Sequence, residues 1–243
     1  MRLLNTSTFE IEVFQGCAIP EYAILSHTWE DEEVSLQDFH TDAVINKKGY
    51  RKVKGFCEKA ASDGFQYCWA DTCCIDKTSS AELSEAINSM FQWYKDSRIC
   101  YAYLADVKEP TNSTRENDES FRNSRWWTRG WTLQELIAPT IVEFYTANWT
   151  ELGTILSLQD QIAEITGIDH GVLCGVRPFQ RNVAVRMSWA ARRTTTRIED
   201  QAYCLMGLFG VNMPLLYGEG NRAFRRLQEE IMRVREDYTL FTW

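Results

Sequence analysis

One carboxylate stands out in this sequence because of the residues around it. Glu135 lies in an otherwise apolar turn of a predicted helix, within residues 129–139 (RGWTLQELIAP) and four residues after Trp131. Two further tryptophans, Trp126 and Trp127, precede this turn. Surroundings of low dielectric constant raise the pKa of a carboxyl group and can fit it for acid–base or electrostatic chemistry. Glu135 is therefore the first candidate for a catalytic residue.

A structural role for the same residue is also open. Thr132 and Glu135 have the spacing of a capping box, in which the glutamate binds the backbone at the start of its own helix. The three tryptophans are compatible with a hydrophobic core. The two roles require different directions of the Glu135 side chain: toward a cleft, or toward the first amide of the helix.

The overall charge narrows the classes of function. The 243 residues contain 34 acidic and 26 basic side chains, a formal net charge of −8. This charge disfavours nucleic acid or an anionic membrane as the main partner. The N-terminus is too polar for a secretory signal peptide, and no run approaches the roughly 18 apolar residues of a transmembrane helix. We therefore expect a cytoplasmic protein that binds neither nucleic acid nor membrane.

The cysteines lack the spacing of a metal site. Among the eight, only Cys68, Cys73 and Cys74 cluster, and neither a Cys-x-x-Cys pair nor a partnering histidine accompanies them. Reduced, buried thiols are the expectation for a cytosolic protein. A metal-dependent hydrolase built on Asp71, Asp76 and these cysteines is disfavoured because the spacings are wrong for zinc, so we expect no metal.

Strands that alternate with helices must position the candidate residues. Short apolar runs and amphipathic stripes predict strands at residues 21–26, 65–71, 99–104 and 141–145, helices at residues 50–61 and from residue 79 onward, and an exposed loop at residues 106–124. This alternation predicts an α/β fold with a mostly parallel central sheet flanked by helices. Ligands of such sheets bind at the carboxyl ends of the strands. Ser26 and Asp71 are the last residues of two predicted strands, and His27 follows the first of them.

The pattern becomes helical from residue 151. Apolar periodicity predicts helices at residues 152–165, 183–191, 202–209 and 219–234. We therefore distinguish an α/β core, residues 1–150, from a helical C-terminal part, residues 151–243, that packs on the core as one continuous domain. An exposed basic face is expected in the C-terminal part, formed by Arg181, Arg186, Arg192, Arg193 and Arg197.

Several motifs resemble the heterokaryon incompatibility (HET) domain of filamentous fungi. They are residues 22–29 (YAILSHTW), 69–77 (WADTCCIDK), 82–90 (ELSEAINSM) and 129–135 (RGWTLQE). Residues 186–190 (RMSWA), 196–204 (TRIEDQAYC) and 216–220 (LYGEG) resemble the sequence that commonly follows this domain. The resemblance implies a cytosolic module of programmed cell death and innate immunity. It also implies self-association and an upstream receptor with a nucleotide-binding oligomerisation domain.

HET domains are in turn distantly similar to Toll/interleukin-1 receptor (TIR) domains, some of which cleave NAD. Residues 22–26 resemble the first TIR strand with its terminal serine, here Ser26. Residues 131–136 resemble the TIR segment whose glutamate, here Glu135, is catalytic in the enzymes. Thr132 replaces a cysteine of that segment, and Arg129 replaces a serine. The similarity implies a TIR-like (flavodoxin-like) sheet with HET-specific insertions.

Cleavage of NAD at its nicotinamide–ribose bond needs few catalytic groups. The nicotinamide is cationic and departs neutral, so that one carboxylate, Glu135, can suffice to stabilise an oxocarbenium-like transition state. Tryptophan can stack the nicotinamide ring, and basic groups can neutralise the pyrophosphate. The residues that we assign to NAD binding are Ser26, His27, Trp29, Asp71, Lys77, Arg129 and Trp131.

Two functions remain open on these grounds. The first is a NAD glycohydrolase of the TIR-like type that acts in cell death on self-association, with NAD as substrate and no bound cofactor. The alternative is a non-enzymatic signalling or adaptor module that acts through protein–protein interaction. Convergence of Glu135 and Ser26 on one open cleft would favour the enzyme. A Glu135 side chain directed at the amide of its own helix start would favour the adaptor.

Overall fold

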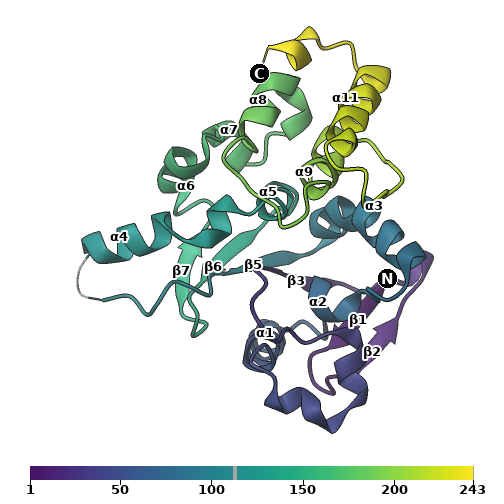
Figure 1. The fold of residues 1–243 in the computed structure, drawn as a ribbon. Helices are drawn as coiled ribbons and strands as arrows, with labels where there is room; N and C mark the ends of the chain where they lie inside the picture. The colour runs from purple at the N-terminus through teal and green to yellow at the C-terminus, as the bar shows by residue number, and fades with distance from the viewer. Residues whose placement is uncertain (112–113, 243) are drawn as a thin grey trace.

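The centre of the protein is a seven-stranded mixed β-sheet (Figure 1). The computed structural model describes residues 1–111 and 114–242. The strands are β1 (Arg2–Asn5), β2 (Ile11–Val13), β3 (Tyr22–His27), β4 (Tyr67–Trp69), β5 (Ile99–Tyr103), β6 (Val142–Tyr145) and β7 (Glu151–Thr154). Their order across the sheet is β2-β1-β4-β3-β5-β6-β7. The predicted α/β class is confirmed.

The four central strands are parallel. β3 pairs with β4 and with β5, and β5 pairs with β6. Every residue of β3 and β5 is buried, as expected for strands of a parallel sheet that is covered on both faces. The pairing sets Ser26 opposite Ala102 and His27 opposite Tyr103. Ser26 and His27 therefore lie at the carboxyl end of the sheet.

The edges of the sheet are antiparallel, and in this respect the prediction of a mostly parallel sheet is wrong. β1 pairs antiparallel with β2 and β4, and β7 pairs antiparallel with β6. Strands β1, β2 and β7 have the sequences RLLN, IEV and ELGT, none of which is a continuous apolar run of the kind that predicts a buried strand. Because β7 lies within residues 151–243, the C-terminal part is not helical throughout, although its separation from residues 1–150 stays a prediction.

Helices cover both faces of the sheet. α1 (Tyr50–Ser62) lies on one side, and α3 (Ser80–Asp96) and α5 (Thr132–Ile137) lie on the other (Figure 1). α3 begins where the sequence predicts, because the side chain of Ser79 accepts a hydrogen bond from the Glu82 amide at 3.3 Å. α2 (Asp71–Cys74) follows β4 directly. α4 (Thr114–Arg122) corrects the predicted loop at residues 106–124; its sequence is too polar to form the apolar stripe that predicts a helix.

The helices after β7 gather on the side of α5, above the sheet in Figure 1. They are α6 (Gln159–Thr166), α7 (His170–Leu173), α8 (Val183–Ser188), α9 (Asp200–Tyr203), α10 (Met206–Phe209) and α11 (Arg222–Val234). Short 3-10 helices are η1 (Gly16–Ala18), η2 (Leu36–His40), η3 (Asp42–Asn46), η4 (Arg125–Thr128), η5 (Pro178–Gln180) and η6 (Tyr238–Phe241). Across the described residues, no helix is long and apolar enough to cross a membrane.

Backbone pairing fastens the C-terminal part to the segment before α5. The Thr194 amide donates to the Thr128 carbonyl at 2.6 Å, and the Gly130 amide donates to the Thr194 carbonyl at 2.9 Å. These bonds form an isolated parallel bridge between Arg129 and Thr194. The chain that follows Thr194 is thereby held beside the start of α5.

Trp149, in the turn between β6 and β7, packs on α1. Its ring stacks on Phe56 at a centroid separation of 6.2 Å and lies 5.0 Å from the ring of Tyr103 at the end of β5. Gly55 of α1 faces the indole, and a Cβ atom at this position would lie 2.3 Å from Nε1 of Trp149. A glycine inside a helix costs about 1 kcal/mol relative to alanine, and the approach of Trp149 explains its presence here.

The substitution Gly55→Ala tests this packing, because its effect on the free energy of unfolding should reverse when Trp149 is removed. In the wild-type background we expect it to lower the free energy of unfolding by about 1–3 kcal/mol, because the added methyl group overlaps the indole. In a Trp149→Ala background the overlap is absent, and the same substitution should raise the free energy of unfolding by up to about 1 kcal/mol through helix propensity. Urea denaturation of the four proteins measures both effects. An equal cost in both backgrounds would contradict the described contact.

Candidate active site

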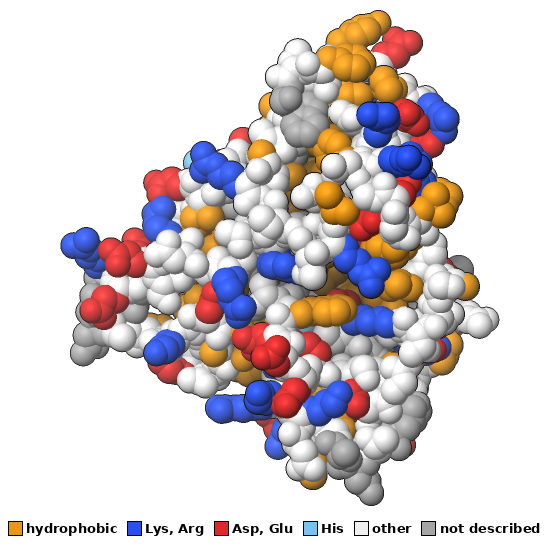
Figure 2. Space-filling view, in the orientation of Figure 1, with side chains coloured by type: hydrophobic (Ala, Val, Ile, Leu, Met, Phe, Trp, Pro, Cys, Tyr) orange, Lys and Arg blue, Asp and Glu red, His pale blue; other side chains and the backbone are white. Residues whose placement is uncertain are grey.

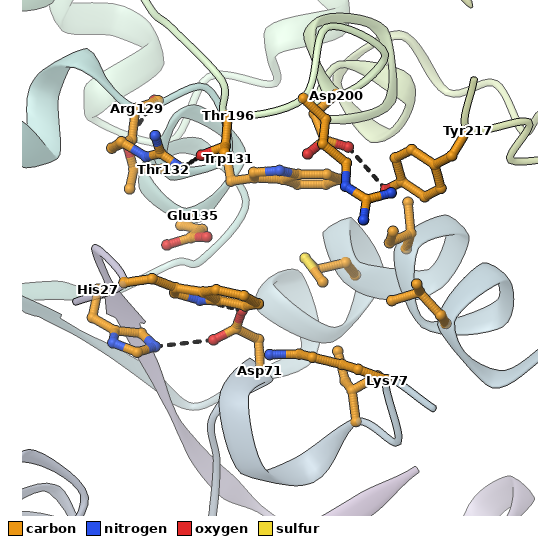
Figure 3. Close-up of a pocket in the computed structure, with 16 residues that line it drawn as sticks. His27, Asp71, Lys77, Arg129, Trp131, Thr132, Glu135, Thr196, Asp200 and Tyr217 are labelled. Carbon is orange, nitrogen blue, oxygen red and sulfur yellow. Dashed lines mark hydrogen bonds and ion pairs between the residues drawn. The ribbon is translucent and has the colours of Figure 1, made fainter. Parts of the chain in front are cut away.

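A cavity of about 350 Å³ lies at the carboxyl ends of β3 and β4 (Figure 3). Residues from these strand ends, from α3, from the start of α5 and from the C-terminal part line it. The predicted site residues on its wall are His27, Trp29, Asp71, Lys77, Arg129, Trp131 and Glu135. On the face seen in Figure 2, basic and hydrophobic side chains meet at the centre of the molecule, where the C-terminal helices approach α2 and α3.

Glu135 projects from α5 toward this cavity, between Trp131 and Asp71 (Figure 3). Its Oε2 atom accepts a hydrogen bond from the Ser26 hydroxyl at 2.5 Å. Ser26, at the end of β3, is fully buried behind the cavity wall and accepts a hydrogen bond from Nε1 of Trp126 at 2.9 Å. The structure therefore brings Ser26 and Glu135 together, with Ser26 supporting the carboxyl group from behind.

The capping box considered for Thr132 and Glu135 does not form. The Thr132 hydroxyl lies 2.6 Å from the carbonyl oxygen of Trp126 and 2.9 Å from that of Arg129, to which it can donate. The start of α5 carries no side-chain cap. Thr132 stabilises the turn before α5 through these hydrogen bonds, so the Glu135 side chain is not needed there and faces the cavity. Of the three tryptophans, Trp126 and Trp127 are buried in the core, and Trp131 lines the cavity.

Burial controls the protonation of Glu135. The residue is 6% exposed, and burial raises the pKa of its carboxyl group to about 8. The hydrogen bond from Ser26 opposes this rise, the negative charge of Asp71 adds to it, and the positive charge of Arg193 opposes it. Without a ligand, the protonated form of Glu135 therefore predominates at neutral pH.

Asp71 is held in the opposite state. Burial opposes its ionisation, but Lys77, His27 and Trp29 outweigh burial and hold the pKa of the Asp71 carboxyl well below its usual range. Nε1 of Trp29 donates to Oδ2 of Asp71 at 2.8 Å, and Nζ of Lys77 lies 3.5 Å from the centroid of the Trp29 ring. The four predicted residues thus form one cluster on the wall opposite Trp131 in Figure 3.

His27 supports this cluster as a neutral side chain. Burial, with the charge of Lys52, lowers the pKa of the imidazole. Its Nε2 lies 3.0 Å from Oδ1 of Asp71. Because an ionised carboxylate only accepts hydrogen bonds, Nε2 carries the proton and donates. Nδ1 lies 4.0 Å from Glu33 and has no hydrogen-bond partner among the described residues.

The C-terminal part contributes a wall that we did not predict. Arg197, Asp200 and Tyr217 line the cavity. The Tyr217 hydroxyl donates to Oδ1 of Asp200 at 2.9 Å (Figure 3). The Arg197 guanidinium lies 4.5 Å from the centroid of the Tyr217 ring. Arg129 reaches the same wall through a 3.2 Å hydrogen bond to Thr196. Residues 196–204 and 216–220 were recognised as family-like motifs, and this was the available signal for these residues.

Two arginines depart from the predicted exposed basic face. Arg186 is fully buried and donates to the carbonyl oxygen of Leu208 at 2.9 Å. Nη1 of Arg193 donates to the Arg129 carbonyl at 2.9 Å and to Oγ1 of Thr132 at 2.8 Å. Arg193 therefore holds the turn from which α5 begins. The prediction was wrong because an arginine that binds carbonyl oxygens cannot be distinguished from a solvated one by sequence alone.

The protonated state of Glu135 should appear in the pH dependence of stability. Between the usual pKa of 4.5 and the folded-state value of about 8, the folded protein retains a proton that the unfolded chain has lost. The resulting stabilisation of the folded state is complete below pH 4.5 and is lost as the pH rises to about 8. We expect the free energy of unfolding to fall, relative to Glu135→Gln, by up to about 1.4 kcal/mol per pH unit across this window.

Urea denaturation between these two pH values measures this difference. Glu58→Gln is the matched control, since the Glu58 side chain on α1 is 64% exposed, and its curve should follow the wild type. Parallel pH curves for the wild type and Glu135→Gln would show that the carboxyl group is not protonated in the folded state.

Comparison of the sequence with known proteins identifies the family of this chain. The family model described as heterokaryon incompatibility protein (HET) matches residues 22–117, and a domain of unknown function (DUF8212) matches residues 222–243. The vegetative incompatibility protein HET-E-1 of Podospora anserina is 48% identical over 220 residues, which cover 88% of this chain and 16% of that protein. No solved structure matches the chain significantly. The chain therefore belongs to the heterokaryon incompatibility family and carries its HET domain.

Proposed function

We propose that this chain is a cell-death effector of fungal incompatibility that hydrolyses NAD at the nicotinamide–ribose bond. The similarity to a vegetative incompatibility protein supports the cell-death role. The observation that carries the enzymatic role is the direction of Glu135, which faces a cavity of about 350 Å³ instead of capping its helix. A buried carboxyl group supported by Ser26 can stabilise the transition state of this reaction, and the aromatic rings and cations of the cavity can bind its substrate.

The cationic nicotinamide would create the reactive state of Glu135. A positive charge next to a carboxyl group favours its ionised form, so substrate binding would lower the pKa from about 8 and release the proton. The carboxylate would then stabilise the positive charge that develops on the ribose as the C–N bond breaks and its electron pair leaves with nicotinamide. A water molecule would complete hydrolysis by bonding to the ribose carbon and losing a proton.

The remaining assigned residues would bind the rest of NAD. Trp131 offers a ring on which nicotinamide could stack, and Lys77 and Arg129 offer positive charge to the pyrophosphate. His27 and Asp71 offer hydrogen bonds to ribose, and Trp29 anchors Asp71. Ser26 would act on the substrate only through Glu135, because it is fully buried.

The wider setting is part of the same proposal. Across the sheet, the four parallel strands have the order β4-β3-β5-β6, which is 2-1-3-4 when they are numbered along the chain. Flavodoxin-like sheets begin with this order, which supports a TIR-like core. We further propose a cytoplasmic location, activation by self-association and control by an upstream receptor with a nucleotide-binding oligomerisation domain. The chain spans 16% of the relative that it matches, so such domains would be supplied by other segments or partners.

Nicotinamide release from NAD tests the enzymatic role directly. We expect the concentrated wild-type protein to release nicotinamide and Glu135→Gln to do so at least about a hundredfold more slowly, because the amide cannot carry the compensating charge. Chromatography of the products measures the rate, and Glu58→Gln controls for the loss of an exposed carboxylate. If assembled wild type releases nothing, or folded Glu135→Gln is equally active, NAD hydrolysis is excluded. Cell killing that persists in Glu135→Gln would then favour the adaptor function.

The pH profile provides a second, independent readout. Free enzyme must lose the Glu135 proton on the way to the transition state, so we expect kcat/KM to rise with pH and to level off near the pKa of about 8. Initial rates at low NAD concentration give this quantity. A profile that is already level at pH 6 would contradict a role for a carboxyl group with raised pKa.

A further inference from the structure

A second cavity, of about 450 Å³, lies behind the start of α5. Gly130 and Arg193 contribute to its wall from the side of α5, and α11 contributes Arg225. None of the described residues that line it carries a carboxylate. In a chain with 34 acidic and 26 basic side chains, a cavity whose described lining includes two arginines and no acidic residue is a local reversal of charge.

Neither arginine of this cavity has a carboxylate partner. Arg193 uses Nε and Nη1 to donate to the carbonyl oxygens of Trp189 and Arg129 and to the hydroxyl of Thr132. Its Nη2 is buried with no hydrogen-bond partner among the described residues. Arg225 is exposed, and within the described part of the chain it forms no ion pair. A buried guanidinium without a counterion is costly.

The carboxyl group of Glu135 does not neutralise Arg193. Burial lowers the pKa of the Arg193 guanidinium only to about 10, so it stays charged at neutral pH. Glu135, whose charge would attract Arg193, is protonated under the same conditions. The positive charge of Arg193 therefore has no counterion among the described residues.

We propose that this cavity binds a small organic anion, with a phosphate or carboxylate group on an apolar body. Arg225, which is exposed, would donate hydrogen bonds to the anionic group, since guanidinium forms strong charge-assisted hydrogen bonds with both oxyanions, and the charge of Arg193 would attract the same group. Gln201, Asn221 and Gln228 supply further hydrogen-bonding groups, while Met187 and Leu205 supply apolar surface. The volume lies within the range of small-molecule sites, roughly 300–1,000 Å³.

This site is separate from the proposed NAD site but coupled to it through Arg193. Arg193, which lines the second cavity, also holds Arg129 and Thr132 at the start of α5 through its guanidinium group. A bound anion would offset the positive charge that Arg193 exerts on Glu135 and would favour the protonated form of that residue. The ligand would accordingly act as a negative regulator if the first cavity hydrolyses NAD, although its binding does not depend on that activity.

Calorimetric titration with three matched probes tests the proposal at constant ionic strength. Phenyl phosphate and benzoate carry the two anionic groups on the same ring, and phenol is the neutral control. We expect at least one anion to bind at least about tenfold more tightly than phenol, because a charge-assisted hydrogen bond contributes about 1.5–3 kcal/mol. Comparison of the two anions identifies the preferred group.

Charge-reversal variants locate the binding. Arg225→Glu should weaken binding by about tenfold or more, whereas Arg222→Glu, an exposed arginine of the same helix outside the cavity lining, should leave it nearly unchanged. Lys77→Gln and Glu135→Gln, in the first cavity, should also leave it unchanged even if the protein proves not to hydrolyse NAD. The proposal is overturned if neither anion binds more tightly than phenol. It is equally overturned if Arg222→Glu matches Arg225→Glu, or if Lys77→Gln abolishes binding.

Discussion

A carboxyl group buried where α5 meets the end of β3 imposes the strictest requirement on this structure. Removing Glu135 from water is costly unless its oxygens find partners, and Ser26 and Trp126 supply a continuous chain of hydrogen bonds. Ser26 can do so because the parallel pairing of β3 and β5 places it at the strand end. Trp126 reaches Ser26 because the short helix η4, which precedes α5, lies beside the end of β3. Sheet register, tryptophan-rich segment and helix are therefore fixed together by one buried group.

Two carboxyl groups of the cavity wall, those of Asp71 and Glu135, differ because their surroundings differ. Asp71 has cationic and hydrogen-bonding neighbours that keep it ionised, while Glu135 lies in a more apolar setting that keeps it protonated. Separation of this kind allows two residues of similar chemistry to take different roles. Asp71 consequently carries a permanent negative charge, while Glu135 carries one that a cationic ligand can induce. A neutral compound of the same shape would encounter the charge of Asp71 but would not induce a charge on Glu135.

The sequence predicted the parts of the fold that have strong local signals. β3, β5 and β6 were predicted because buried parallel strands are almost continuously apolar, and α3 because an apolar stripe follows its Ser79 cap. β1, β2 and β7 lack such signals because their pairing, rather than their own composition, makes them strands. In the cavity, Glu135 and Asp71 could be singled out by local context. Arg197, Asp200 and Tyr217 could not, since contacts between distant segments, such as the bridge between Arg129 and Thr194, bring them near α5.

That bridge also bears on the order in which the chain is synthesised. The first half of the cavity is encoded between His27 and Glu135, but its last wall residue, Tyr217, lies close to the end of this chain. A ribosome must therefore translate nearly all of these residues before the cavity can close, however early the sheet forms. Truncated translation products would contain Glu135 and its tryptophans without the wall that faces them. Under the proposed function, such products would carry the candidate catalytic carboxylate without a complete cavity to bind a substrate.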